Sequence, residues 1–284
     1  MKTRSKIMFN IFTLVALLAS LLGSAVFVPS VQASQDNSLT FAGGTSLYVA
    51  TSGSDSNDCL TISTPCQTIN AAIGKAAVVG DTIYVATGIY TGSGTDVVLI
   101  NKNVTLSGGW NASFAAQDSR STIDGQNVRR GITILQINKD VVVTVNYFTI
   151  QNGFGEGQTT YSPGGGVSNY GTLTLSNSII TNNVSEYTTG GGIFNSGTLT
   201  LSNSTVNNNI ARNAGGGIYN VGPLLIINNS VISNNTAGDI NYPYGGGGGI
   251  VNGGTAVVNN SMISNNTVLG NPSSGSGIST GGNG

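Results

Sequence analysis

The pattern of apolar and polar positions repeats along the second half of the chain. Three copies read GGGVSNYGTLTLSNSIITNN from Gly164, GGGIFNSGTLTLSNSTVNNN from Gly190 and GGGIYNVGPLLIINNSVISNN from Gly215. Looser copies begin at Gly247 and Gly275. The glycine before the Val or Ile lies at 166, 192, 217, 249 and 277, which gives spacings of 26, 25, 32 and 28 residues. A period of about 20 to 50 residues indicates stacked structural units rather than a closed globule.

Each copy predicts three short strands separated by turns. In the second copy the strands are Ile193-Phe194, Thr198–Leu201 and Thr205-Val206. The middle strand alternates polar and apolar residues, with Leu199 and Leu201 on one face, which is typical of a half-buried strand. So many Gly and Asn residues would be costly inside helices. We expect the glycines and residues such as Asn203 and Asn208 to form the turns, because both types tolerate left-handed backbone.

One such unit cannot bury its own apolar face, so we expect the units to stack at about 4.8 Å per layer. The predicted interior columns are Val167, Ile193, Ile218 and Ile250; Leu175, Leu201, Ile227 and Val258; and Ile180, Val206, Ile232 and Ile263. A predicted amide ladder runs through Asn177, Asn203, Asn229 and Asn260. Three strands and three corners per turn predict an all-β, single-stranded parallel β-helix. We expect it to be right-handed, because crossovers between parallel strands are overwhelmingly right-handed.

The N-terminal segment is typical of a secretory signal peptide. Residues 1–33 combine basic Lys2, Arg4 and Lys6 with an apolar run and a small-residue cleavage site ending at Ala33. A membrane anchor is the alternative interpretation. No second apolar stretch is long enough to span a bilayer, so we expect no membrane span after cleavage. The predicted order is a signal peptide at 1–33, a flexible leader at 34–46 and the β-helix at 47–284, with the regular repeats at 164–284.

The first coils are less regular. Thr68–Ala77 predicts a short helix with Ile69, Ala72 and Ile73 on one face. We expect it to cap the solenoid, whose first layer would otherwise expose apolar interior and unpaired strand edges. Further predicted strands are Leu47–Ala50, Asp81–Val85, Val97–Ile100, Val104–Leu106, Ile132–Ile137 and Val142–Ile150. Between them, Gly109–Arg130 is expected to be a loop-rich insertion that contains the only tryptophan.

The last residues, 268–284, are rich in Gly, Ser and Asn and contain no apolar cap. Three interpretations fit this pattern: the chain is a piece of a longer protein, the last coil frays, or a partner covers it. The first is the one we expect.

Composition excludes several classes of protein. The 284 residues contain 42 Gly, 39% hydrophobic and 7% charged residues, which excludes collagen and argues against disorder. Lys and Arg number 10 and Asp and Glu 11, so the chain offers no basic surface for nucleic acid. Without the signal peptide, 7 basic and 11 acidic residues leave a net charge of −4. The chain has no His, which excludes any mechanism that needs a His base or a His metal ligand.

The two cysteines lie seven positions apart. In an exported chain, Cys59 and Cys66 predict a disulfide that holds one loop. The alternative is a metal site that adds the oxygens of Asp55 and Asp58.

Two motifs carry a resemblance to known proteins. YVATSGSDSNDC…PCQTINAAI…GDTIYVATGIYTG resembles the first coils of right-handed parallel β-helix proteins of the pectin-lyase-like superfamily. The GGGI-xN-x-GTLTLSNS repeat is similar to repeats of bacterial secreted and outer-surface β-helix proteins, including the polymorphic outer-membrane protein group. The resemblance implies the fold, but this fold serves lyases, hydrolases, adhesins and stalks alike.

An enzyme of this fold needs clustered carboxylates, and the repeats have few. From Gly164 onward the charged residues are Glu186, Arg212 and Asp239, each in a different repeat. A Ca²⁺ site or a glycosidase site requires acidic groups close together. The alternative function is therefore a divergent polysaccharide lyase or glycoside hydrolase, with Ca²⁺ possible only for the lyase, and its carboxylates would be Asp118, Asp124 and Asp140.

The loops before each GGG favour a binding function. They vary in length, fall at one position in the repeat, and would line up along one edge of the stack, where insertions often mark the binding face. The candidate residues are Phe154, Tyr161, Tyr187, Arg212, Asp239, Tyr242 and Tyr244. Aromatic rings with a polar rim suit sugar rings. We expect a secreted or cell-surface, non-catalytic scaffold for adhesion or for binding polysaccharide or cell-surface glycan, without a cofactor. Ordinary solvated loops on a purely structural stalk are the simpler alternative.

Overall fold

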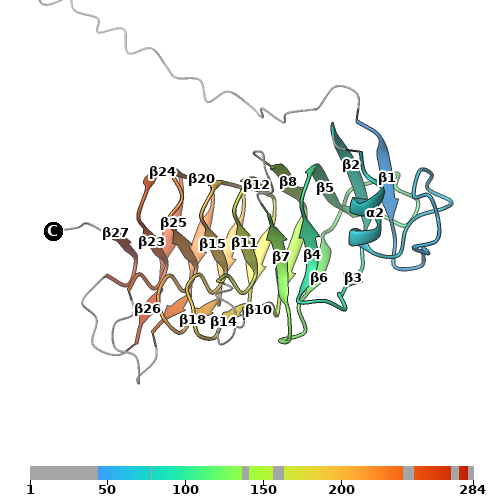
Figure 1. Cartoon of the computed structure of the whole chain (residues 1–284). Coiled ribbons are helices and arrows are strands. Elements are labelled where there is room, and N and C mark those ends of the chain that lie inside the picture. The colour runs from blue at the N-terminus through green and yellow to red at the C-terminus, as the bar shows by residue number, and fades with distance from the viewer. Residues whose placement is uncertain are drawn as a thin grey trace, which may run out of the picture. The chain divides into compact units, whose positions relative to one another are not determined.

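The computed structural model describes residues 44–77, 79–135, 141–155, 163–238, 246–269 and 275–280. All described residues belong to one compact unit within Phe41–Gly284. That unit is a parallel β-solenoid of about 6 turns with four parallel sheets (Figure 1). The predicted parallel β-helix is therefore confirmed. The predicted signal peptide and most of the predicted leader lie outside the described residues.

The four sheets are named A to D, and a regular coil passes through them in the order A, B, D and C. Sheet A contains β1 (Ser46–Val49), β2 (Val79–Ala86), β5 (Asn103–Trp110), β8 (Val142–Asn146), β12 (Thr172–Ser176), β16 (Thr198–Ser202), β20 (Leu224–Asn228) and β24 (Thr255–Asn259). Sheet B contains β3 (Ile89–Tyr90), β6 (Ser121–Asp124), β9 (Phe148–Gln151), β13 (Ile179–Thr181), β17 (Thr205–Asn207), β21 (Val231–Ser233) and β25 (Met262–Ser264). Sheet C contains β4 (Asp96–Ile100), β7 (Arg130–Ile134), β11 (Val167–Asn169), β15 (Ile193–Asn195), β19 (Ile218–Asn220), β23 (Ile250–Asn252) and β27 (Ile278–Thr280). Sheet D contains β10 (Phe154–Gly155), β14 (Val184–Ser185), β18 (Ile210–Ala211), β22 (Thr236–Ala237) and β26 (Thr267–Val268).

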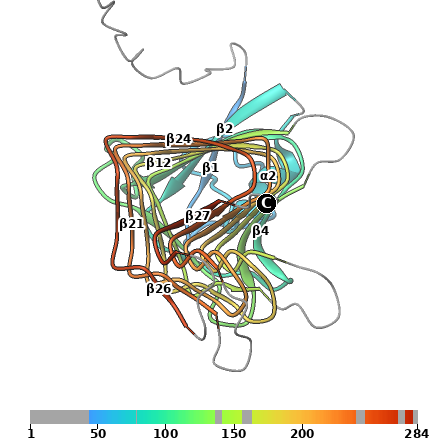
Figure 2. The same cartoon turned by 90° about the vertical axis from the view of Figure 1, so that its left-hand side faces the viewer.

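Sheet D corrects the prediction of three strands per coil. Each of its strands has only two residues, such as Val184-Ser185 in β14. Two residues are too few to show the alternation that identifies a strand in a sequence. The regular coils therefore have four strands and four corners, and Figure 2 shows them in projection along the stack.

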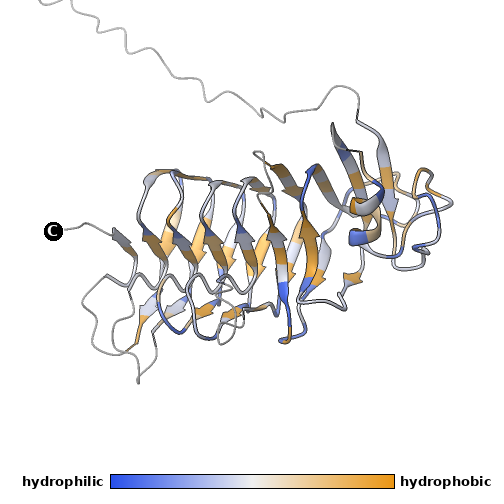
Figure 3. Ribbon diagram, viewed as in Figure 1, coloured by the Kyte–Doolittle hydropathy of each residue, from blue (hydrophilic) through white to orange (hydrophobic). Residues whose placement is uncertain are grey.

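The three predicted interior columns are confirmed. Val167 pairs with Ile193, which pairs with Ile218 and then Ile250, and the other two columns show the same in-register pairing. Apolar residues recur along the strands of successive coils in Figure 3. These side chains are at most 1% exposed, except in the last coil, where Val258 is 39% exposed. The hydrophobic core of the regular coils is thus a stack of equivalent layers of Val, Ile and Leu side chains.

One short helix, α2 (Ile69–Lys75), precedes the regular solenoid among the described residues, within the predicted range 68–77. It begins at Thr68, whose side chain accepts a hydrogen bond from the Ala71 N–H, and it buries Ile69 on the core. Asn70 donates to the Val97 carbonyl and accepts from the Leu99 N–H. Since β4 is the first strand of sheet C, this side chain satisfies backbone groups of an edge strand.

Two details of the first coils differ from the prediction. The expected loop-rich insertion at Gly109–Arg130 contains a strand, β6, which pairs with β3 and β9 in sheet B. The expected single strand Val142–Ile150 is divided into β8 and β9 by Tyr147, which has a φ of 59°. A residue with left-handed backbone turns the chain whatever the polarity of its side chain. The corner at Tyr147 therefore left no polar gap in the sequence that would have divided the predicted strand.

Asparagine forms two buried ladders, and neither is the predicted one. The first ladder runs through Asn183, Asn209, Asn235 and Asn266, and the second through Asn169, Asn195, Asn220 and Asn252. In each, the side-chain amide donates to Oδ1 of the equivalent residue in the next coil, at 2.6–3.0 Å. The predicted ladder residues Asn177, Asn203, Asn229 and Asn260 instead have φ values of 46–50°. They form a corner, because Asn tolerates left-handed backbone better than most residues.

The repeated Asn-Asn pair divides these two tasks between neighbours. Asn208 has a φ of 55° and turns the chain, which was predicted, whereas Asn209 is fully buried in the first ladder. Serine forms a third ladder at the preceding corner, where the Ser178 N–H donates to Ser204 Oγ and the Ser204 N–H to Ser230 Oγ. The repeated Asn and Ser side chains therefore form hydrogen bonds with backbone N–H and C=O groups at the corners of the regular coils.

Candidate functional site

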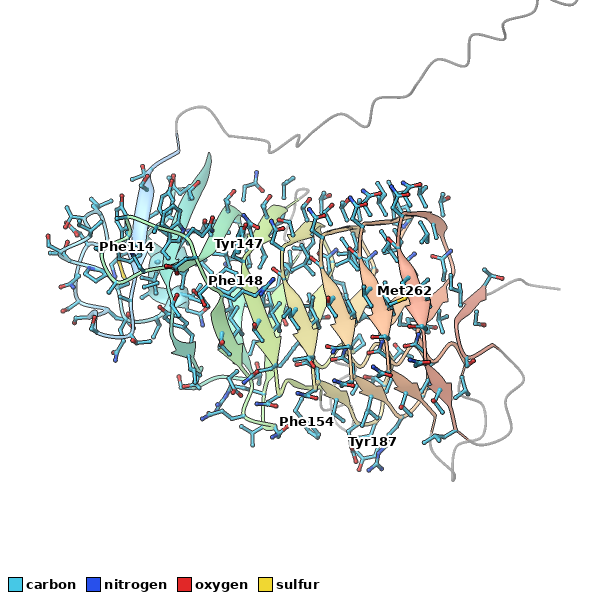
Figure 4. All side chains as sticks on the ribbon, turned by 180° about the vertical axis from the view of Figure 1, so that it is seen from behind. Phe114, Tyr147, Phe148, Phe154, Tyr187 and Met262 are labelled. Carbon is cyan, nitrogen blue, oxygen red and sulfur yellow. A yellow bond between two sulfur atoms is a disulfide. The ribbon has the colours of Figure 1, made fainter. Side chains whose placement is uncertain are left out.

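The structure describes three of the seven predicted loop-edge residues. Phe154 lies on β10, Tyr187 follows β14, and Arg212 follows β18. The remaining candidates, Tyr161, Asp239, Tyr242 and Tyr244, lie outside the described residues. Phe154 and Tyr187 lie along the same margin of the solenoid in Figure 4. The described part of the predicted edge thus belongs to sheet D and the segments that leave it.

Arg212 connects an acidic and an aromatic side chain from the neighbouring coil. Its Nη2 lies 2.6 Å from Glu186 Oε1, and its Cζ lies 5.9 Å from the centre of the Tyr187 ring. The contact follows from the register, because Ser185 pairs with Ala211 and the next residues are Glu186 and Arg212. The Tyr187 side chain remains 43% exposed. The result is an exposed ring beside a neutralised ion pair.

An apolar stripe on the outer face of sheet D adjoins this group. Phe154 pairs with Val184, and Val184 pairs with Ile210, so that their side chains share one face in three successive coils. Ile210 is 43% exposed, and Phe154 and Val184 are half-buried. The stripe becomes polar at Thr236 in the next coil. We call the stripe together with Glu186, Tyr187 and Arg212 the sheet D ridge.

Sequence reasoning placed aromatic residues at this edge but missed the stripe. Two-residue strands have no periodic signal, so Val184 and Ile210 gave no indication that they face solvent. The available signal was their position, because each directly follows an Asn-Asn pair in consecutive repeats.

The predicted carboxylate cluster is described in part. Asp118 is exposed, and Asp140 lies outside the described residues. Asp124 accepts hydrogen bonds from the Gln126 N–H, the Gln151 side chain and the Asn152 side chain. Burial would raise the pKa of Asp124, but these hydrogen bonds outweigh it and hold the pKa below its ordinary value. Asp124 thus acts as an acceptor that ties strands β6 and β9 to the following turn.

A buried ion pair was not anticipated from the sequence. Arg130 Nη1 lies 3.1 Å from Asp96 Oδ1, and both side chains are nearly buried between adjacent strands β7 and β4. Thr133 donates to the same Asp96 oxygen, and Arg130 Nε donates to the Gly164 carbonyl. Burial lowers the pKa of Arg130, and the Asp96 charge opposes that change. The pair links three successive coils of sheet C.

The cysteines form the predicted disulfide, Cys59–Cys66. The carboxylates considered for the alternative metal site have backbone partners. Asp55 accepts from the N–H groups of Gln67 and Thr68, and Asp58 accepts from the Leu60 N–H, which helps to lower the Asp58 pKa. Within the described ranges, no three His, Cys, Asp or Glu residues are grouped so that they could hold a metal ion.

A cleft of about 520 Å³ lies between α2 and the first coil. Its lining includes Asp55, Asn70, Ile89 and Tyr90. The Tyr90 hydroxyl donates to the Ala86 carbonyl, and both Asp55 and Asn70 are bonded to the backbone. These three polar side chains of the cleft therefore already have hydrogen-bond partners within the protein, and that of Asn70 joins α2 to strand β4.

Four aromatic rings gather on the outer face of sheet A at its N-terminal end. Tyr48 stacks on Tyr84 with ring centres 5.5 Å apart, Phe114 meets the Tyr48 ring at 5.1 Å, and Trp110 meets the Tyr84 ring at 5.3 Å. Because the rings contact one another and the Trp110 N–H donates to Ser107 Oγ, the cluster anchors the segment after β5. Each of these four side chains is half-buried, whereas Tyr187 of the sheet D ridge is 43% exposed.

A search for membrane-crossing segments among the described residues finds no helix that is both long and apolar enough. Comparison of the chain with protein-family models, curated proteins and solved structures finds no match.

Proposed function

We propose that the protein is an exported, non-catalytic β-helix scaffold, of the pectin-lyase-like type that its first coils resemble, and that its sheet D ridge binds polysaccharide at a cell surface. The observation that carries the proposal is the exposed Tyr187 ring, held beside Arg212 and next to the outward stripe of Phe154, Val184 and Ile210. A sugar ring has apolar faces and a hydroxyl rim, so it fits an aromatic ring flanked by hydrogen-bonding groups.

The ridge also suits an extended ligand. Its apolar position is occupied in three successive coils, by Phe154, Val184 and Ile210, and the coils stack about 4.8 Å apart in a parallel sheet. A polymer that lies along the stack would meet equivalent positions in each coil. Since Glu186 neutralises Arg212, the described ridge has no net charge. We therefore expect it to prefer neutral polysaccharides to polyuronates.

The alternative, a polysaccharide lyase or hydrolase, needs carboxylates that are close together and available to substrate. Asp124 is engaged by three hydrogen-bonding groups, and Asp96 is paired with a buried arginine. These contacts favour a binding function over a catalytic one.

The test is retention of the purified chain in gels or columns that contain neutral polysaccharides or polyuronates, with product release followed in parallel. We expect retention by a neutral polysaccharide, without turnover. The variant Tyr187→Ala should weaken retention at least several-fold while leaving stability within about 0.5 kcal/mol, because the side chain is exposed.

The matched control is Tyr147→Asn. Tyr147 lies at the corner between sheets A and B, away from the ridge in Figure 4, and its left-handed backbone is the one that Asn adopts in the following coils. Equal retention of Tyr187→Ala and the parent protein would refute the assignment of the ridge. Product formation would support the lyase or hydrolase instead. A chain that shows neither retention nor product formation would leave the structural stalk as the interpretation.

A further inference from the structure

The outer face of sheet A contains a regular column of threonines. Thr82 pairs with Thr105, and the register continues through Thr144, Thr174 and Thr200, so five successive coils place threonine at one position. Each of these side chains is half-buried and points away from the core, because both of its neighbours in the strand are buried. At about 4.8 Å per coil, this threonine column extends over about 19 Å.

A second outward position widens the column into a grid. Strands β12 and β16 both read TLTLS, so Thr172 lies two residues before Thr174, and Thr198 lies two residues before Thr200. Alternate residues of a strand lie about 6.8 Å apart on the same face. A serine occupies the third outward position of both strands. The two strands therefore present a rectangular array of hydroxyl groups, with one repeat set by the coils and the other by the strand.

This face is also flat and uncharged. The pairing from β8 to β24 contains no register shift, and Figure 2 shows β12 and β24 along the same straight side of the coil. Sheets that stay flat over many strands are typically held by side-chain ladders, and the Asn and Ser ladders join the same coils. Strands β5, β8, β12, β16, β20 and β24 contain no Asp, Glu, Lys or Arg.

The hydroxyls of the threonine column are available to an external partner. Within the described ranges, these five hydroxyls have no hydrogen-bond partner in the protein, and none of them is buried. Threonine branches at Cβ, which restricts its side-chain rotamers, so the hydroxyl and methyl groups are largely ordered before anything binds. Each hydroxyl offers one donor and two acceptor lone pairs. The face thus presents a fixed, repeating pattern of hydrogen-bonding and methyl groups.

We propose that the outer face of sheet A binds ice, with the threonine column at its centre. On the prism faces of hexagonal ice, the water oxygens form a rectangular array. Its shorter repeat is close to the spacing of the coils, and its longer repeat is close to the spacing of alternate strand residues. The ice surface is neutral, as this face is, and it both donates hydrogen bonds to hydroxyl groups and accepts them.

The number of matched positions determines whether such binding succeeds. A hydroxyl that bonds to ice gives up an equivalent bond to liquid water, so one contact contributes little. The gain comes from a rigid array in which the contacts form together, because the first contact brings the others into place. An interruption near the centre of the array should therefore abolish ice binding rather than reduce it by one contact among many.

The test is partition of the purified chain into slowly growing ice, with thermal hysteresis measured on the same samples. We expect the parent chain to be enriched in the ice and to hold the freezing point below the melting point. Thr174→Lys places a long, strongly hydrated charge in the array, so both effects should be lost, and Thr200→Lys should do the same. The matched control is Thr181→Lys, because Thr181 lies in the same coil as Thr174 and is also half-buried and outward-facing, but on sheet B. It should behave like the parent.

Exclusion of the parent chain from ice would overturn the proposal, and this measurement does not depend on the folding of any variant. Equal partition of the parent and both sheet A variants would also refute it, as would equal losses in Thr181→Lys and Thr174→Lys. Exclusion from ice combined with retention on a crystalline polysaccharide that Thr174→Lys abolishes would assign the face to that solid instead. Tyr187→Ala should bind ice like the parent, so the ice and sheet D ridge proposals succeed or fail independently.

Discussion

The first asparagine ladder permits a quantitative test. Asn209 is fully buried and makes four hydrogen bonds at its side chain. Its Nδ2 donates to the Ile180 carbonyl at 3.0 Å and to Asn235 Oδ1 at 3.0 Å. Its Oδ1 accepts from the backbone N–H of Asn183 at 3.0 Å and from the side-chain amide of Asn183 at 2.9 Å. The residue therefore joins three successive coils.

Asn209→Ala removes all four bonds. Two buried donors of Asn183, the backbone N–H and one amide hydrogen, then lose their acceptor. A buried donor without a partner costs about 1–3 kcal/mol, so the expected loss in the free energy of unfolding is about 2–6 kcal/mol. The neighbouring change Asn208→Gly is the control. Asn208 has a φ of 55°, which glycine adopts freely, so we expect a change of no more than about 1 kcal/mol.

The assay is urea denaturation followed by circular dichroism, with the difference in free energy taken from the shift in midpoint at constant slope. Asn209→Asp adds a second readout. Its carboxylate keeps an acceptor for Asn183 but buries a charge, so the variant should be unstable at neutral pH and regain stability as the pH falls and the group is neutralised. If Asn209→Ala costs less than 1 kcal/mol, or no more than Asn208→Gly, then the ladder does not stabilise the coil as inferred.

Three further predictions concern other parts of the solenoid. Gly197→Ala should destabilise the fold by at least about 2 kcal/mol, because the added Cβ would overlap backbone atoms of the adjacent coil. Gly74→Ala in α2 should instead stabilise the fold by about 0.5–1 kcal/mol, because its Cβ would meet nothing within 4 Å, and thermal unfolding of both variants checks this contrast. Replacing Cys59 and Cys66 by Ser should cost about 2.5 kcal/mol by the loop-entropy relation for so short a loop, and calorimetry with and without reductant would show a smaller value if the reduced loop stays ordered. The lowered pKa of Asp124 contributes stability that is present above its unfolded pKa of about 3.9 and is lost as the pH falls through the folded value. The fall in the free energy of unfolding at acid pH should therefore be less steep in Asp124→Asn than in the parent protein. An unchanged acid dependence would show that the hydrogen bonds to Asp124 are unimportant.

The interior of the solenoid could be predicted because the alternation of Leu199 and Leu201 is a direct record of which side chains face inward. The corners could not be predicted with the same accuracy. Asn177 and Asn183 both recur once in each of the regular repeats from Gly164 onward, so their spacing does not show which of them turns the chain and which points inward. Only the backbone angles separate the two tasks, with left-handed φ at Asn177 and a buried amide at Asn183.

The candidate site shows the same limit. The sequence indicated that Tyr187 and Arg212 occupy equivalent loops, and the register of β14 and β18 brings them within contact distance. The register also places Val184 beside Ile210 on the outside, which no local pattern indicated. Pairing between coils is a long-range property, and a two-residue strand carries too little information to reveal it.

The first ladder has a consequence for how such a chain can change in length. Each of its asparagines presents the same acceptor to the preceding coil and the same donor to the following one. Removing one coil therefore brings together two surfaces that already match. Duplication or loss of a whole repeat preserves packing and hydrogen bonding where the flanking coils meet, whereas the insertion or deletion of a few residues within a strand shifts the register of that coil against its neighbours. Genetic events that copy complete repeats can thus lengthen or shorten the scaffold while each remaining coil keeps the surface it displays.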